Sequence, residues 1–263
     1  MQGTLAQQIA LTTYGNAYLR GEPGVDWQAF FPSNNAFSCC EFVRFVDRGG
    51  READATDTPY ASEPVAWFER LARDGVSRIR LVCGILRGEQ HPRWFNEAIT
   101  PKGADIWDAR WELGDQSRPD QKIWRITYAR VETDQPPVQL PPVDPADLRR
   151  RFAASLMDSR DLARRHGMDW FAKAFDAGRA ALDGTPTEMA GYDLAPDSIL
   201  PPDARHLLAA VQASWVFGGM GSWNDVGFEG ADHDIYQRSS QELYRALNEA
   251  VIVAANALPI SGS

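Results

Sequence analysis

Five prolines fall within the ten residues from Pro136 to Pro145, and this feature constrains the fold of the chain more than any other. Proline lacks a backbone N–H and has a fixed φ, so the stretch cannot continue a helix or an inner strand. It favours extended backbone with few contacts. We therefore predict a linker at residues 133–143, between an N-terminal domain at residues 1–132 and a C-terminal domain at residues 144–258.

The chain is acidic along its whole length. Its 263 residues carry a formal net charge of −9, and acidic side chains outnumber basic ones both before and after residue 140. Binding to phosphate backbones requires a basic face, so this charge argues against nucleic acid as a partner. No apolar run is long enough to span a membrane and no secretory signal is evident, which predicts a cytoplasmic protein that does not bind membranes. The three lysines, against many arginines and alanines, suggest a GC-rich bacterial genome.

The N-terminal half contains the patterns of both helices and strands. Apolar residues recur every four positions over residues 4–19, which predicts an amphipathic helix, and Ser62 can cap a second helix that ends before Gly75. A short helix is predicted at residues 93–99. Alternating strand formers predict strands at residues 36–47, 77–86, 104–113 and 122–131. The last two strands should form an antiparallel hairpin, so we predict an α+β domain with a small, mainly antiparallel sheet.

The C-terminal half reads as four helices. Asp144 is a cap for the first helix, whose first position is Pro145, and an Asp234–Gln237 capping box marks the start of the last one. The predicted helices span residues 145–166, 169–183, 203–217 and 234–254. We therefore predict a four-helix, all-α domain.

A Gly-rich motif, F-G-G-M-G-S-W-N-D, spans Phe217 to Asp225 between the last two predicted helices. Glycines permit positive φ and close approach of other groups, so the loop can present a small polar binding surface. The candidate binding residues are Gly219, Gly221, Ser222, Trp223, Asn224 and Asp225. A structural interpretation competes with this one: Gly218 follows a helix end, Met220 and Trp223 fill the core, and Asn224-Asp225 turns the chain.

Together with the upstream segment L-A-R-R-H-G-M-D-W-F-A-K-A-F, this motif resembles an uncharacterised bacterial helical domain family that carries F-G-G-M-G-S-x-N-D. The resemblance covers roughly residues 145–257. It implies a bacterial, intracellular helical domain, and it supplies neither an activity nor a catalytic residue.

Candidates for chemistry are few. Asp232, His233 and Asp234 are close enough in sequence to form a weak candidate for a metal site, but acidic residues at the start of a helix also oppose its dipole. Cys83 and His91 could act as nucleophile and base if they were adjacent. The three cysteines have no zinc spacing, and we expect all of them to be buried, reduced and unreactive. We predict no catalytic residue and no cofactor, because no common enzyme motif occurs.

These observations favour a non-enzymatic, acidic protein-interaction module of an accessory or immunity type, whose partner is another, basic protein. The negative charge suits such a partner, and nine tryptophans supply contact anchors. The alternative is a hydrolase or small-molecule-binding protein with a site at the Gly-rich loop between the domains. The two hypotheses differ in whether Asn224, Asp225 and His233 face a common cavity or are engaged in capping bonds.

Overall fold

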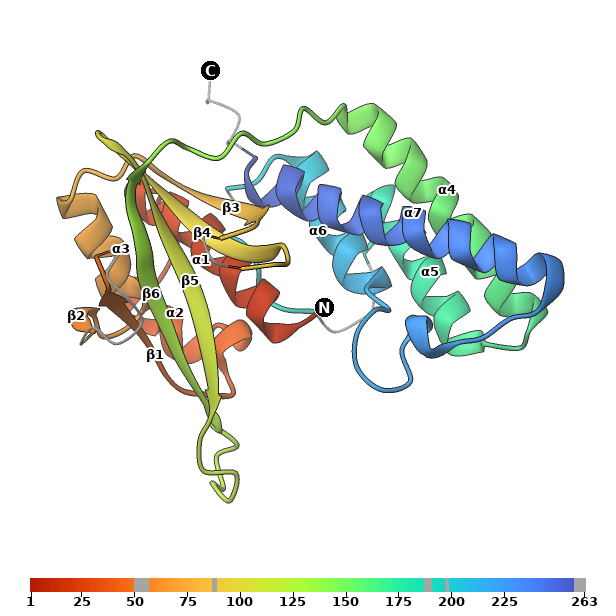
Figure 1. The fold of residues 1–263 in the computed structure, drawn as a ribbon, viewed down its shortest axis with the longest axis horizontal. Coiled ribbons are helices and arrows are strands. Elements are labelled where there is room, and N and C mark those ends of the chain that lie inside the picture. The colour runs from red at the N-terminus through yellow and green to blue at the C-terminus, as the bar shows by residue number, and fades with distance from the viewer. Residues whose placement is uncertain (50–56, 87–88, 187–190, 197–198, 258–263) are drawn as a thin grey trace. The chain divides into compact units, whose positions relative to one another are not determined.

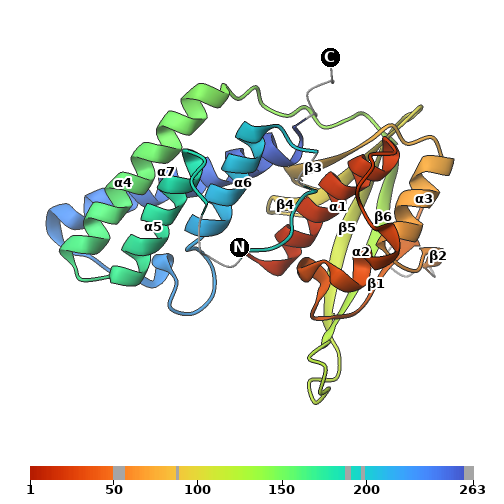
Figure 2. The same ribbon diagram turned by 180° about the vertical axis from the view of Figure 1, so that it is seen from behind.

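The computed structural model describes residues 1–49, 57–86, 89–186, 191–196 and 199–257, and it divides into two compact units (Figures 1 and 2). The sheet unit comprises Gly3–Leu140 and Tyr192–Ile199, and the helical unit comprises Met1–Gln2, Pro141–Gly191 and Leu200–Ser263. The predicted α+β class is confirmed, because a mixed sheet with helices is followed by a helical region.

The sheet unit is built on a six-stranded sheet in the order β2-β1-β6-β5-β4-β3. The strands are β1 Cys40–Asp47, β2 Thr58–Ala61, β3 Arg78–Gly84, β4 Arg93–Thr100, β5 Gly103–Leu113 and β6 Trp124–Gln135. Strands β1 and β6 pair in parallel, and the other four pairings are antiparallel. The predicted hairpin is confirmed as β5 and β6, with Ala109 opposite Tyr128.

Strand β4 corrects the prediction of a short helix at residues 93–99. The strand pairs with β3 on one side and β5 on the other. Two polar residues in its middle, Asn96 and Glu97, are fully buried. Because both faces of the strand are covered, the apolar–polar alternation that identifies a strand is lost from the sequence.

The helices of the sheet unit are α1 Gly3–Leu19, α2 Trp27–Ser33, the 3-10 turn η1 Asn35–Phe37 and α3 Pro64–Arg73. Helices α1 and α2 lie on the same face of the sheet, which is turned away from the viewer in Figure 1 and toward the viewer in Figure 2. Trp67 of α3 stacks on Phe45 of β1 at 4.6 Å between ring centroids and meets Trp107 of β5 edge-on at 5.4 Å. These aromatic contacts form the core on this side of the sheet.

Helix α1 is buried on nearly every side, which corrects the expectation of an amphipathic helix. Its polar side chains bond to neighbouring backbone: the Asn16 side chain donates to the Ile79 carbonyl at 2.7 Å and accepts from the Ile79 N–H at 2.8 Å. The Thr13 hydroxyl donates to the Leu194 carbonyl. Residues 193 and 194, which lie within the predicted C-terminal domain, therefore contact α1, whose residues Leu5 to Ala17 are all buried.

The opposite face of the sheet carries no helix of this unit among the described residues, and we call it the helix-free face. Strand alternation assigns side chains to it: Trp107 and Tyr128 point toward the helices, so Asp108 and Thr127 point away from them. The helix-free face includes Arg44, Val46, Asp108, Arg110, Thr127 and Ala129.

The proline-rich segment makes more contacts than the linker with few contacts that was expected for residues 133–143. Its first residues belong to β6, and Val138 and Leu140 then pack on a buried cluster of Val82, Phe95 and Ile106. The Val138 N–H donates to Glu97 Oε1 at 2.8 Å. Proline prevents continued ladder pairing, but it does not prevent the intervening apolar side chains from packing.

The helical unit consists of α4 Pro145–Arg165, α5 Asp169–Leu182, α6 Pro202–Ser214 and α7 Gly230–Ala255, with a 3-10 turn η2 at Trp223–Asp225. The predicted cap of α4 is confirmed, since the Asp144 carboxylate accepts from the Ala146 N–H at 3.0 Å. Two predicted boundaries are wrong. Helix α6 ends at Ser214 rather than Phe217, and α7 begins at Gly230, ahead of Asp234. In the described part of the chain, no helix combines the length and apolar character needed to cross a membrane.

Candidate functional site

The Gly-rich loop, residues 215–229, connects α6 to α7 and depends on left-handed backbone. Gly218, Gly219 and Gly221 have φ values of 87°, 83° and 78°, which side chains other than glycine rarely adopt. A Cβ atom on Gly219 or Gly221 would meet no heavy atom within 4 Å. The glycines at these two positions are therefore required by backbone conformation rather than by lack of space.

The polar side chains of the loop bond to one another. Asp225 Oδ2 accepts from the Ser222 N–H at 3.1 Å, which forms a capping box around η2. Asn224 Oδ1 accepts from the Ser222 hydroxyl at 2.7 Å and from the Gly218 N–H at 3.1 Å. These bonds favour the structural interpretation of the motif, in which Asn224 and Asp225 shape the turn.

Trp223 anchors the loop in the core of the helical unit, which corrects its inclusion among the binding residues. The side chain is fully buried. Its indole N–H donates to the Ser240 hydroxyl at 2.8 Å, and its carbonyl accepts from the Tyr236 hydroxyl at 2.7 Å. Its ring contacts the rings of Phe171, Phe175, Phe228 and Tyr236. A ligand cannot reach this side chain without opening the core.

The position of Met220 also differs from the expectation. We expected it to fill the core, yet its side chain is fully exposed, at 104% of the reference area. Glycines on both sides, in left-handed conformation, turn the backbone so that only Trp223 enters the interior. The sequence places both apolar side chains in one motif, and only the backbone path separates their roles.

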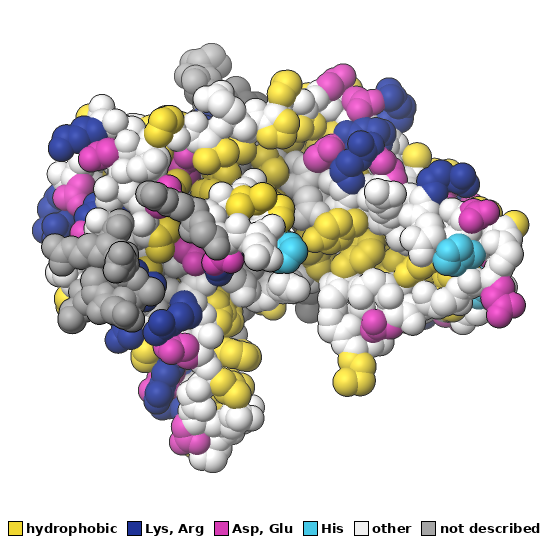
Figure 3. Space-filling view, viewed as in Figure 1, with side chains coloured by type: hydrophobic (Ala, Val, Ile, Leu, Met, Phe, Trp, Pro, Cys, Tyr) yellow, Lys and Arg dark blue, Asp and Glu magenta, His cyan; other side chains and the backbone are white. Residues whose placement is uncertain are grey.

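A group of partly exposed rings accompanies the loop, and we call Trp215, Phe217 and Tyr244 the aromatic patch. The Tyr244 ring lies 5.3 Å from that of Phe217 and 6.5 Å from that of Trp215, and half of the Tyr244 side chain is exposed. Figure 3 shows hydrophobic side chains gathered over α6 and α7 on the face it draws. The sequence analysis did not identify this patch.

The candidate metal residues, Asp232, His233 and Asp234, lie near the start of helix α7. Asp232 Oδ1 accepts from Arg165 at 2.7 Å, and Asp232 Oδ2 lies 2.8 Å from His166 Nε2. The hydrogen bond with His166, followed by that with Arg165, lowers the pKa of Asp232. His233 and Asp234 are exposed. Across the described residues, no group of three or more His, Cys, Asp or Glu side chains is arranged to hold a metal ion.

The cysteines differ from the prediction that all three are buried. Cys40 is buried, but Cys39 and Cys83 are exposed. Cys39 precedes β1, and Cys83 lies near the end of the edge strand β3, where coverage is incomplete. Partial desolvation raises the pKa of the Cys83 thiol, which disfavours the reactive thiolate.

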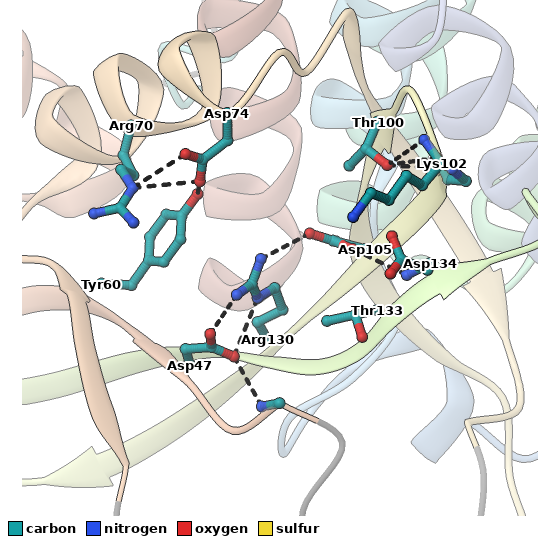
Figure 4. Close-up of polar contacts among 12 residues, drawn as sticks. Asp47, Tyr60, Arg70, Asp74, Thr100, Lys102, Asp105, Arg130, Thr133 and Asp134 are labelled. Atoms are coloured by element: carbon teal, nitrogen blue, oxygen red, sulfur yellow. Dashed lines mark hydrogen bonds and ion pairs between the residues drawn. The ribbon is translucent and has the colours of Figure 1, made fainter.

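A network of charged and aromatic side chains lies at one end of the sheet, and the sequence analysis did not identify it (Figure 4). Arg130 of β6 pairs with Asp47 of β1 and with Asp105 of β5, the latter at 3.0 Å. Its guanidinium lies over the Tyr60 ring at 5.3 Å, and the Tyr60 hydroxyl donates to Asp74 at 2.6 Å. Burial, and then the bond to Asp74, raise the pKa of Tyr60. These bonds and contacts join the four strands β1, β2, β5 and β6 to the C-terminal end of α3.

Comparisons of this chain with family models, with curated proteins and with solved structures found no match.

Proposed function

We propose that the protein is a non-enzymatic, acidic protein-interaction module, of an accessory or immunity type, and that its helical unit binds another protein through the Gly-rich loop and the aromatic patch. One observation carries this proposal. Met220 is fully exposed on a loop whose polar side chains bond to one another. Covering such a side chain would contribute about 1.5–3 kcal/mol, a gain that folding alone does not provide here.

The aromatic patch extends the apolar surface beside the loop. Phe217 is adjacent to Gly218 in the chain, and Tyr244 reaches Phe217 from α7. Methionine and aromatic residues are enriched at protein interfaces, where their large apolar side chains are covered by the partner. The net charge of −9 favours a basic partner through long-range attraction.

The alternative of a hydrolase or a small-molecule site at this loop receives less support. Ser222, Asn224 and Asp225 would supply its polar groups, but they already satisfy each other and the backbone of the turn. A substrate would have to break these bonds before it could use the groups.

The test is affinity capture from the native host with the full chain as bait. We expect one set of proteins to be recovered with the wild type and lost with Met220→Glu or Tyr244→Glu, because each places a charge in the apolar surface. Met157→Glu is the matched control, since Met157 is also exposed but lies on α4. Recovery of the same proteins with all four baits would contradict the proposal, provided that the melting temperatures agree.

A further inference from the structure

A cavity of about 560 Å³ lies between strands β1 and β2, at the edge of the helix-free face. Its apolar lining includes Phe42, Val46, Pro59 and Ala61. Two charged side chains, Arg44 and Asp57, also line it. The cavity therefore combines an apolar wall with a small number of charged groups, as small-molecule sites do.

The two charged side chains of the cavity are not equivalent. The Asp57 carboxylate accepts from Arg48 Nε at 2.7 Å and from Arg48 Nη2 at 3.3 Å. This hydrogen bond with Arg48, supported by the charges of Arg110 and Arg44, lowers the pKa of Asp57, so the carboxylate is ionised and already neutralised by its partner. Arg44 forms no ion pair with any residue that the structure describes. Asp57 therefore acts on Arg44 only at longer range, and the terminal nitrogens of Arg44 have no carboxylate within ion-pair distance among the described residues.

The guanidinium of Arg44 is held in place without using its terminal nitrogens. Its Nε donates to the Thr127 hydroxyl at 3.0 Å, and its Cζ lies 5.1 Å from the centroid of the Phe42 ring. The strand register places Thr127 beside Arg44 and Arg110 beside Thr127, so the second arginine lies two strands away on the same face. An arginine held in this way loses little entropy when it binds an anion.

We propose that this cavity binds a small organic acid, whose anionic head group pairs with the terminal nitrogens of Arg44 and whose apolar body lies against Phe42, Val46 and Pro59. The guanidinium fork matches both carboxylate and phosphate, so either head group has the required chemistry. The volume of about 560 Å³ lies within the range of small-molecule sites. This site is in the sheet unit and is independent of the interaction surface on the helical unit.

The test is isothermal titration calorimetry on the full chain with three probes that share one ring: benzoate, phenyl phosphate and benzyl alcohol. We expect at least one anion to bind, and benzyl alcohol, which has no charge, to bind at least about tenfold more weakly. Tighter binding of benzoate would identify a carboxylate site, and tighter binding of phenyl phosphate a phosphate site.

Variants then assign the binding to Arg44. Arg44→Gln should weaken the preferred anion by about tenfold or more, and Arg44→Lys, which keeps the charge but loses the fork, should weaken it by a smaller factor. Arg125→Gln is the matched control, because Arg125 lies on the same face but is already paired with Glu41 at 2.8 Å. The proposal is overturned if neither anion binds at millimolar concentration, or if Arg44→Gln binds as tightly as the wild type.

Discussion

The Gly-rich loop and the helix-free face present opposite kinds of side chain to their surroundings. In the loop, Ser222, Asn224 and Asp225 bond internally and Met220 is exposed. On the helix-free face, Val46 and Ala129 are buried and Arg44 is exposed. A motif rich in short polar residues is thus not a polar surface, because short side chains reach the N–H groups of their own turn. A long arginine on a rigid strand reaches beyond its own backbone.

The largest expected effect tests the anchor of the loop. Trp223→Ala should destabilise the helical unit by about 3–5 kcal/mol, since it removes a fully buried indole and leaves a cavity among four rings. Urea unfolding followed by circular dichroism measures this change. Trp170→Ala is the matched control, because Trp170 is 61% exposed, and it should change stability by less than about 0.5 kcal/mol. Similar losses for both variants would show that the loop does not depend on this side chain.

The second prediction compares the stability contributions of two ion-paired arginines of the sheet, one with a buried partner and one with an exposed partner. Arg80 pairs with the fully buried Glu97 at 2.6 Å, and Arg80→Gln should cost about 3 kcal/mol because it leaves a buried carboxylate without its partner. Arg110 pairs with Glu112 at 3.2 Å with both side chains about half exposed, and Arg110→Gln should cost at most about 1 kcal/mol. Denaturant midpoints of the two variants measure the difference. Equal losses would mean that burial does not distinguish the structural arginine from the surface one.

The third prediction concerns the backbone of the loop. Gly221→Ala should cost about 1 kcal/mol through strain at positive φ, since the space around it is open. Gly227 also has open space around it but is not at positive φ, so Gly227→Ala should be neutral or slightly stabilising. Thermal melts of the two variants are compared. If Gly227→Ala were the more damaging change, the strain argument would be wrong.

The smallest effect is expected at Asp225. Asparagine caps nearly as well as aspartate, so Asp225→Asn should shift the free energy of unfolding by less than about 0.5 kcal/mol and leave partner capture unchanged. Asp225→Ala, which removes the acceptor for the Ser222 N–H, should cost about 1 kcal/mol. Loss of partner capture in Asp225→Asn at an unchanged melting temperature would instead make this carboxylate part of the binding surface.

Much of the fold could be predicted because its signals are local. The cap at Asp144, the left-handed Gly75 after α3, and the alternation along β5 and β6 each depend on a few neighbouring residues. The errors occur where burial removes the pattern. Strand β4 is covered on both faces and was predicted as a helix, whereas α1 was predicted as a helix but is buried on nearly every side rather than on one face.

The candidate sites could be predicted less well than the fold. The motif from Phe217 to Asp225 was identified, and its structural interpretation placed Trp223 correctly and Met220 wrongly in the core. The cavity beside Arg44 was not identified at all. It requires β1, β2 and β6, and Thr127 lies far from Arg44 in the chain.

The sequence by itself determined the class of the fold, the caps and glycine ends of several helices, and the acidic charge of the chain. These properties depend on residue type, on short spacings and on composition, which folding does not change. Only the tertiary structure decided that Val138 packs on the sheet, that residues 192–196 meet α1, and that Arg44 has no carboxylate partner among the described residues. Each of these depends on contacts between distant segments. A local sequence pattern does not specify which distant side chain contacts a given donor, acceptor or apolar surface.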